Sequence, residues 1–293
     1  MTDQNVALPA LVSADASRGR QLLRRLLRDK IALFMLVLLV VIVLAAVFAP
    51  FLTPFDPYRT SLRSRNMPPD LVHWLGTDEQ GRDLVARVLF GIRLTLASGF
   101  TSLFLGGFTG TIIGVTAAYY KRADNLLMRA MDVLLSFPAI LLGLAIAGIW
   151  GPGTWGIIFA LAISTIPPVA RVARAAALGV VNQDYLVAAR ALGLGDFAIL
   201  HRYVLRNCAT SVLVYVTLRF GQVILLGASL SFLGLGAPPP SAELGTMVSQ
   251  GRSLLFTAPH VALVPCFTLF LIVLVLNVLG DAARDIFDPK VQQ

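Results

Sequence analysis

The sequence is poor in charge and in lysine. Only 14% of its 293 residues are charged, whereas 57% are hydrophobic. Because soluble domains carry about 25% charged residues, this composition excludes an ordinary soluble domain and predicts an integral membrane protein. None of the lysines, Lys30, Lys121 and Lys290, follows a glycine. This excludes a Walker A phosphate-binding loop, so we do not expect the chain to bind ATP in that way.

Cysteine and histidine are also scarce, with two and three residues respectively. The three histidines, His73, His201 and His260, lie far apart in the sequence and no cysteine pair accompanies them, so they predict no metal-binding cluster. Cys208 and Cys266 are expected near opposite membrane faces, which argues against a disulfide. No Ser/His/Asp arrangement supports a membrane enzyme. We expect no catalytic residue, metal or cofactor in this chain.

Long apolar runs predict an all-α protein with six transmembrane helices, since each run approaches the roughly 20 residues needed to cross a bilayer. Residues 1–30 form a cytoplasmic arm in which Ser17–Lys30 is expected to be a basic amphipathic helix on the membrane surface. A cleaved signal peptide is the alternative, but the following run is too long and lacks a small-residue cleavage site. The six spans are expected at about residues 31–51, 94–120, 130–150, 154–170, 205–235 and 260–279.

The distribution of Lys and Arg orients this six-span unit, residues 31–282. With the N-terminus inside, 16 of the 24 basic residues are cytoplasmic, seven lie outside and one lies in the fifth span. Most of the outside charges occur in one long extracytoplasmic loop, residues 52–93, and the short turns obey the positive-inside rule. Both termini, including the tail 283–293, are therefore predicted to be cytoplasmic. Topology also explains the net charge of +8 better than nucleic-acid binding does.

Prolines and ionisable residues mark special points in the spans. Pro167 and Pro168 are expected to kink or end the fourth span. Asp132 is expected to pair with Arg129, one turn away. An Arg at a helix centre costs about 2.5–3.5 kcal/mol to insert, so Arg219 in the fifth span needs compensation. Two interpretations stay open: a structural partner or snorkelling, and a position on a water-filled transport path.

The second span carries a repeat of small residues, and the two outside loops have features of their own. Gly106, Gly110 and Gly114 repeat every four residues and predict a helix face that another helix approaches closely. Residues 242–259 are expected to form a second outside loop that dips towards the membrane. In the first loop, a charged cluster predicts a solvated, salt-bridged cap at the start of an amphipathic helix, with a cation or substrate site as the alternative. The cluster consists of Asp78, Glu79, Arg82 and Asp83.

Residues 182–207 are too polar to cross the membrane. Gln183–Leu192 is expected to be a helix, with Asn182 as its N-cap and Asp184 in its first turn, where the helix dipole favours an anion. Arg190 lies away from the apolar face of this helix. That face consists of Tyr185, Leu186, Ala189 and Leu192.

Gly193 and Gly195 are expected to break the helix, and Asp196 to cap a second short one. Phe197, Leu200 and Val204 would face inward. Two short amphipathic helices joined at a Gly-x-Gly bend form a compact knob suited to docking on another protein. An ordinary connector at the membrane surface is the alternative.

The knob resembles the EAA loop of permease subunits of bacterial ATP-binding-cassette (ABC) importers. The resemblance rests on Ala188-Ala189, Gly193 and Leu205, although Val187 replaces the usual Glu and Arg206 stands where the motif has Pro. The pattern Tyr-x-x-Ala-Ala-Arg-Ala-Leu-Gly is closer to the dipeptide, oligopeptide and nickel branch. Three further stretches resemble this branch in the same order, so the resemblance covers nearly the whole chain after Arg28. They are GTDEQGRD, SLSFLGLG and GDAARDIFDP.

The resemblance implies the type I ABC importer permease fold in the bacterial inner membrane. It further implies a paralogous second permease, two cytoplasmic ABC ATPase subunits or domains that bind ATP and Mg, and an extracytoplasmic solute-binding protein. The function implied is peptide import, with nickel or metal-chelate import as the alternative. The residues expected to couple the chain to the ATPase are Asp184, Tyr185, Ala188, Ala189, Arg190, Gly193, Gly195 and Asp196.

An ion-coupled secondary transporter or channel is a different class that the sequence leaves open. Such proteins often carry paired ionisable residues at mid-membrane and internal repeats. Here Arg219 is the only charge expected deep in a span, and no repeat is evident.

Overall fold

The computed structural model describes residues 29–287, and within this range every regular element is a helix. The amphipathic helix predicted at 17–30 lies almost entirely outside the described residues. The elements are α2 Lys30–Val47, α3 Ala49–Leu52, η1 Leu62–Ser64, α4 Leu84–Tyr119, α5 Lys121–Ser136, α6 Ala139–Trp150, α7 Thr154–Val181, α8 Asp184–Ala191, α9 Asp196–Ile199, η2 Leu200–Leu205, α10 Arg206–Leu230, η3 Ser231–Leu235, α11 Leu244–Gly251, η4 Arg252–Leu254 and α12 His260–Phe287.

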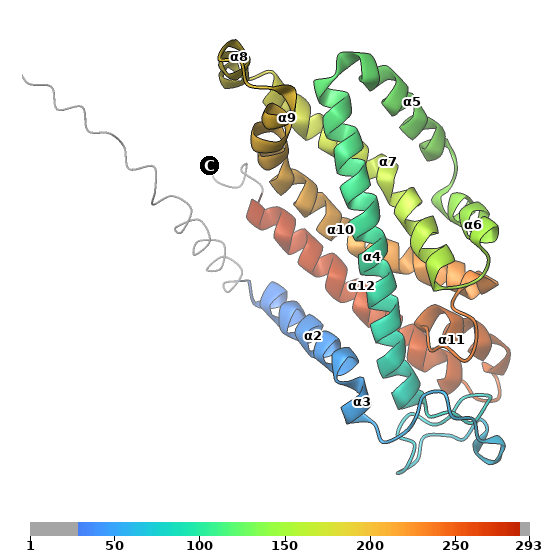
Figure 1. The fold of residues 1–293 in the computed structure, drawn as a ribbon. Coiled ribbons are helices and arrows are strands. Elements are labelled where there is room, and N and C mark those ends of the chain that lie inside the picture. The colour runs from blue at the N-terminus through green and yellow to red at the C-terminus, as the bar shows by residue number, and fades with distance from the viewer. Residues whose placement is uncertain (1–28, 288–293) are drawn as a thin grey trace, which may run out of the picture.

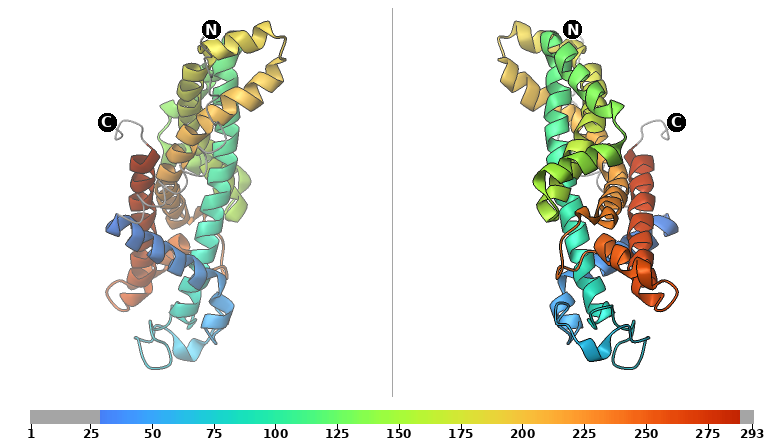
Figure 2. Two further views of the ribbon diagram at one scale, coloured as in Figure 1. Left: turned by 90° about the vertical axis from the view of Figure 1, so that its left-hand side faces the viewer. Right: turned by 90° about the vertical axis from the view of Figure 1, so that its right-hand side faces the viewer.

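The helices form an elongated bundle along α4, which runs from one end of the molecule to the other (Figure 1). At one end lie α8, α9 and the junction of α4 with α5, which we call the knob end. At the other end, residues 53–83 fold beneath the start of α4 and form what we call the cap (Figure 2). Within residues 29–287, five helices are long and apolar enough to cross a membrane, or six if α5 and α6 count as one span.

Helix α4 begins ten residues earlier than the predicted span, at Leu84. Asp83 is its N-cap, and its carboxylate accepts a hydrogen bond of 2.8 Å from the backbone amide of Ala86. The 36 residues of α4 extend about 54 Å at 1.5 Å per residue, which exceeds the roughly 30 Å hydrocarbon layer. Helix α4 is therefore longer than the hydrocarbon layer is thick, which accounts for a polar start that looks like a loop in the sequence.

The third predicted span is a bent pair of helices. Helices α5 and α6 meet at an angle of 96°, where Phe137 has the extended backbone that a following proline favours. The expected pairing of Asp132 with Arg129 is wrong: Asp132 accepts a hydrogen bond of 2.6 Å from Arg171 of α7. This happens because α5 lies along α7 and brings the two side chains together, whereas sequence spacing favours local partners.

Helix α7 continues through its two prolines to Val181, so Pro167 and Pro168 do not end it. Membrane helices tolerate proline where neighbouring helices hold the freed backbone, and Pro167 is buried in the bundle. The predicted second outside loop is also largely helical, since α11 packs there against α12 and η3. Fewer residues are irregular than the sequence suggests.

The central contact of the bundle is a seam between α4 and α7. The predicted small-residue face of α4 lies on this seam. A Cβ added to Gly106 would lie 2.5 Å from the carbonyl oxygen of Ala162, and one added to Gly110 would lie 2.7 Å from that of Ile166. Gly114 approaches the backbone of α7 as closely. The two backbones are in contact along the seam, as small residues allow in membrane helices.

Candidate functional site

The knob consists of α8 and α9, joined by a bend at Gly193, whose φ of +79° is a conformation that glycine adopts without strain. Asn182 is not the N-cap of α8 as expected. It ends α7, and Gln183 precedes α8 instead, because α7 extends further than predicted. Asp184 does lie in the first turn of α8.

The inner face of the knob packs on the last turns of α4 and α7. Leu186 and Ala189 of α8 and Ile199 of α9 are buried there, as is Val204. This contact gives the knob its apolar support. The buried cluster is completed by Val115, Ala118, Ala177 and Cys208.

Three apolar side chains point out of the knob instead of into it. Val187 is 60% exposed, and Leu192 and Phe197 are each 82% exposed. The sequence placed Leu192 on the apolar face of the first helix, together with Tyr185, which is also exposed, and Phe197 on the inward face of the second. Leu192 lies just past the end of α8, at the bend, and Phe197 lies in the first turn of α9, which continues with helical backbone into η2 and α10. We call Val187, Leu192 and Phe197 the knob outer face, and Ala188 and Gly193 are also exposed. Exposed apolar patches of this kind mark interaction sites.

Polar contacts hold the knob to the end of α4. Asp196 was expected to cap α9, but its carboxylate accepts hydrogen bonds from the hydroxyls of Tyr119 at 2.6 Å and Tyr120 at 3.3 Å. The guanidinium of Arg190 lies 5.0 Å above the ring of Tyr119. We call these four residues the tyrosine clamp. Partial removal from water, and then the charge of Asp196, raise the pKa of Tyr120, so its hydroxyl keeps its proton and remains a donor.

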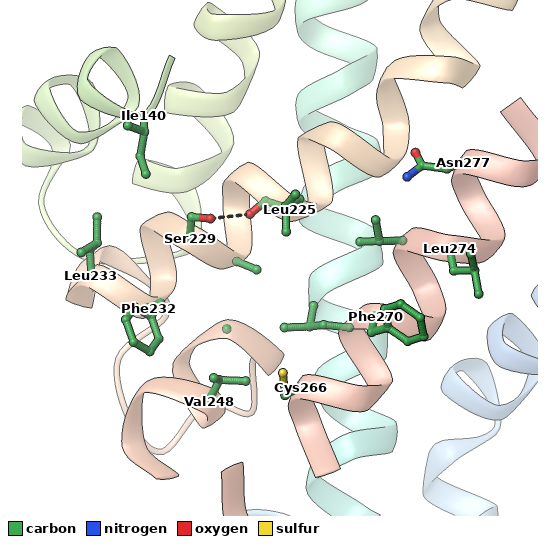
Figure 3. Close-up of a pocket in the computed structure, with 14 residues that line it drawn as sticks. Ile140, Leu225, Ser229, Phe232, Leu233, Val248, Cys266, Phe270, Leu274 and Asn277 are labelled. Carbon is green, nitrogen blue, oxygen red and sulfur yellow. Dashed lines mark hydrogen bonds between the residues drawn. The ribbon is translucent and has the colours of Figure 1, made fainter. Parts of the chain in front are cut away.

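A groove of about 610 Å³ lies between α10 and α12, next to α6 and α11 (Figure 3). Its lining is almost entirely apolar; Cys266 lies in it, and Asn277 stands towards one end (Figure 3). Within residues 29–287 neither Cys266 nor Cys208 forms a disulfide. The other principal lining residues are Ile140, Leu225, Ser229, Phe232, Phe270 and Leu274.

Arg219 lies on α10, on the helical stripe that continues through Gln222 towards Ser229 in the groove. Its guanidinium donates to the side-chain oxygen of Gln222 at 2.8 Å, and its buried Nε has no hydrogen-bond partner among residues 29–287. The carboxylate or carbonyl partner on another helix, one of the two interpretations from sequence, is not seen within this range. Asn277 lines the groove, whereas Arg219 and Gln222 precede its first α10 residue, Leu225, along the helix.

The cap contains a buried ionic cluster. Asp78, Arg82, Asp83 and Arg87 are each no more than 4% exposed. The carboxylate of Asp78 lies 2.7 Å from Nε of Arg82 and 3.2 Å from Nε of Arg87. The expected salt-bridged helix cap is present, but it is packed rather than solvated. Within residues 29–287 no group of His, Cys, Asp or Glu is arranged to hold a metal ion.

Arg87 forms hydrogen bonds both to the cap and to the loop that precedes α11. Its guanidinium donates to the carbonyl oxygens of Pro57, Pro240 and Ser241. Local sequence patterns do not predict the contact with Pro240 and Ser241, because more than 150 residues separate these partners from Arg87. Glu243, also buried, accepts hydrogen bonds from Ser231 and from the backbone amide of Ala237. The cap end therefore holds buried charged side chains that ion pairs and hydrogen bonds connect to the neighbouring loops.

Comparison with known families agrees with this architecture. Residues 110–293 match the family described as binding-protein-dependent transport system inner membrane component, and residues 17–69 match the N-terminal transmembrane domain of oligopeptide transport permease C. The chain belongs to this permease family. It is accordingly a multi-pass component of a bacterial inner membrane transport system.

Relatives of the permease match over nearly their whole length. A putative peptide transport system permease protein of Brucella abortus is 45% identical over 269 residues, which cover 92% of this chain and 91% of the relative. The glutathione transport system permease protein GsiD of Pectobacterium atrosepticum is 42% identical over 279 residues, with 93% and 91% covered. GsiD of Escherichia coli is 40% identical over 271 residues, with 92% and 89% covered.

Solved structures show the same fold. The permease superposes on a chain of an inward-facing MetNI methionine ABC transporter with a TM-score of 0.56 at 21% identity, covering 69% of this chain and 97% of that one. An amino acid ABC transporter chain gives a TM-score of 0.52 at 19% identity, covering 67% and 91%. The permease therefore has the type I ABC importer fold that its motifs implied.

Proposed function

We propose that this permease is one transmembrane subunit of an ATP-driven importer of peptides. The relatives named above support a peptide substrate, since their names specify peptide and glutathione transport. The observation that carries the proposal is the knob outer face. It presents Val187, Leu192 and Phe197 to the surroundings at the knob end, beyond the apolar part of the bundle, so a soluble protein that covers it removes apolar surface from water.

The proposed partner at the knob is an ABC ATPase, present as two cytoplasmic subunits or domains. The chain has no Walker A loop, so ATP and Mg are proposed to bind in those partners. Ala189 is buried in the permease itself and is proposed to support the knob rather than to touch the ATPase. The residues proposed to contact or position the ATPase are Asp184, Tyr185, Ala188, Arg190, Gly193, Gly195 and Asp196.

The groove between α10 and α12 is the proposed path region. It is open on one side and apolar, so a paralogous second permease is proposed to cover it. Arg219 carries a charge at the polar end of the same α10 stripe and is proposed to face water there, where it attracts the carboxylate of a passing peptide. An extracytoplasmic solute-binding protein is proposed to deliver the peptide at the cap end.

Reconstitution tests the function directly. The permease, its paralogue, the ATPases and the binding protein encoded beside them are placed in liposomes, and uptake of labelled dipeptide, glutathione and a nickel chelate is measured with and without ATP. We expect ATP-dependent uptake of a peptide. Uptake driven by an ion gradient without ATP would contradict the proposal, and uptake of the nickel chelate alone would correct its substrate.

A charge on the knob outer face tests the docking site. Phe197→Asp is expected to lower the amount of ATPase that co-purifies with the permease, because a carboxylate then has to be desolvated at the contact. Leu71→Asp is the matched control, since Leu71 is 97% exposed in the cap at the opposite end. Equal ATPase recovery from the parent, Phe197→Asp and Leu71→Asp would argue against docking at the knob.

A further inference from the structure

The chain enters the knob from α7 and leaves it through η2 into α10, and two kinds of side-chain contact that differ in geometry also hold the knob to the bundle. The apolar contact through Leu186 and Ile199 is buried and non-directional. The tyrosine clamp is directional, because Tyr119 and Tyr120 donate to the two different oxygens of the Asp196 carboxylate. Two donors on two oxygens fix the orientation of the carboxylate, and with it the start of α9, relative to the end of α4.

The clamp lies where three helices are joined. Tyr119 is the last residue of α4, and Tyr120 stands between α4 and α5. Helix α5 is joined to α7 through Arg174, whose guanidinium makes two hydrogen bonds of 2.6 Å to the carboxylate of Asp124. Helix α4 is joined to α7 along the glycine seam. Because its backbone already contacts that of α7 at Gly110, α4 cannot move towards α7 independently.

We propose that Tyr119 and Tyr120 are positioning residues that transmit displacement of the knob to the α4–α7 pair during transport. A partner that moves the knob pulls on Asp196, and the clamp passes the movement to the end of α4. The seam then carries it along the bundle as one rigid body. The inference rests on the proposed function, since it assumes that an ATPase moves the knob.

The clamp is suited to this role because it contributes orientation more than stability. Asp196 is exposed and Tyr120 is 41% exposed, so water competes for these hydrogen bonds. The buried cluster beneath the knob keeps it folded without them. Loss of the clamp should therefore change how much transport each ATP produces while leaving the fold intact.

The test removes the two hydroxyl groups and keeps both rings. In the reconstituted complex, Tyr119→Phe/Tyr120→Phe is expected to bind the ATPases and hydrolyse ATP, while uptake per ATP falls about three- to tenfold, the ratio expected for partly exposed hydrogen bonds to a charged group. Asp196→Ala should give a similar loss, and combining all three changes should add little, because the residues act as one unit. The melting temperature should stay near that of the parent.

Tyr58→Phe is the matched control, since Tyr58 packs on Phe90 near the opposite end of α4 and should leave uptake per ATP unchanged. The inference is overturned if the double variant keeps the parental uptake per ATP, or if Tyr58→Phe loses as much. Hydrogen exchange of residues 184–199 in the permease without ATPases separates the two proposals. If the parent shows no ATP-driven uptake, the proposed function fails. In the double variant, exchange should become faster at the start of α9, where the clamp acts, while the buried cluster stays protected; unchanged exchange at the start of α9 overturns the clamp independently.

Discussion

The charged residues near the two ends of α4 differ in their exposure to water. At the cap end, Asp78, Arg82 and Arg87 lie almost entirely out of water. At the knob end, Arg190 and Asp196 are exposed. Taking a charge out of water is costly, and a buried pair offsets this only through close contacts. The cap therefore tolerates little movement, whereas the charges of the knob can exchange one partner for another at small cost.

Buried ion pairs can thus hold α4 in place at the cap end, while a partner bound to the knob can displace its other end. The glycine seam with α7 connects the two ends, because backbone contact along the seam leaves little freedom for either helix alone. Substitutions at the cap and the seam should act on stability. Substitutions at the knob and in the groove region should act on transport.

The largest effect is expected in the cap. Asp78→Ala leaves Arg82 and Arg87 buried without their carboxylate and should lower the free energy of unfolding by about 3–5 kcal/mol. Thermal unfolding of the purified permease measures this loss. Glu79→Ala removes the neighbouring, more exposed carboxylate and should cost less than about 1 kcal/mol. Equal losses from the two variants would show that the buried cluster does not stabilise the cap.

The second-largest loss of stability is expected at the seam between α4 and α7. Gly110→Leu places a side chain where a Cβ alone would lie 2.7 Å from the Ile166 carbonyl, and such overpacking costs about 1–3 kcal/mol. Gly148→Leu is the control, because nothing lies within 4 Å of a Cβ added there on α6. Assembly and melting of both variants are compared with the parent. If Gly110→Leu melts like Gly148→Leu, α4 and α7 do not need their close approach.

At the knob, a smaller stability effect should accompany a large loss of coupling. Nothing lies within 4 Å of a Cβ added at Gly193, but its positive φ costs an ordinary L-residue about 1–2 kcal/mol. Gly193→Asp should stay in the membrane and hydrolyse ATP without uptake. Gly193→Asn tests whether charge or shape is responsible, because asparagine and aspartate have nearly the same shape and both tolerate this conformation, but only aspartate is charged. Substrate-stimulated ATPase activity and uptake at the parental level in Gly193→Asp would contradict the docking role.

Ala189→Asp should behave differently from Gly193→Asp. Ala189 is buried beneath the knob, so its replacement places a carboxylate against apolar side chains and should loosen α8 itself. Faster hydrogen exchange of α8 in the permease alone would confirm this. Parental exchange, with only ATPase binding lost, would place Ala189 at the partner contact instead.

The smallest effect on stability is expected at Arg219. Its single hydrogen bond within the described residues goes to Gln222 on the same helix, so Arg219→Leu should assemble and melt almost normally while peptide uptake falls. Arg219→Lys keeps the charge without the planar fork and should be intermediate. An assembled Arg219→Leu complex with parental uptake would remove Arg219 from the path, and failed assembly would indicate a structural role.

Local sequence patterns predicted several parts of the fold well. Apolar runs located the helices that can cross the membrane, and the Gly-x-Gly bend was predicted correctly as the end of α8. The second helix is not a separate short one, because from Asp196 it continues into the fifth span. The apolar runs and the bend depend on residues within one or two turns of each other, which spacing records directly. The pairs between helices were not predictable in this way. Asp132 joins Arg171 instead of Arg129, and Asp196 meets Tyr119 across 77 positions.

By itself the sequence determined the all-helical membrane class, the permease family resemblance and the absence of a Walker A loop, because composition and motif spacing are properties of the chain. Only the tertiary structure decided where α4 begins, that α5 and α6 bend apart, and which way Leu192 and Phe197 face. The physical reason is burial. Whether a charged or apolar side chain meets water, lipid or another helix depends on residues distant in the sequence, and those are brought together only when the bundle packs.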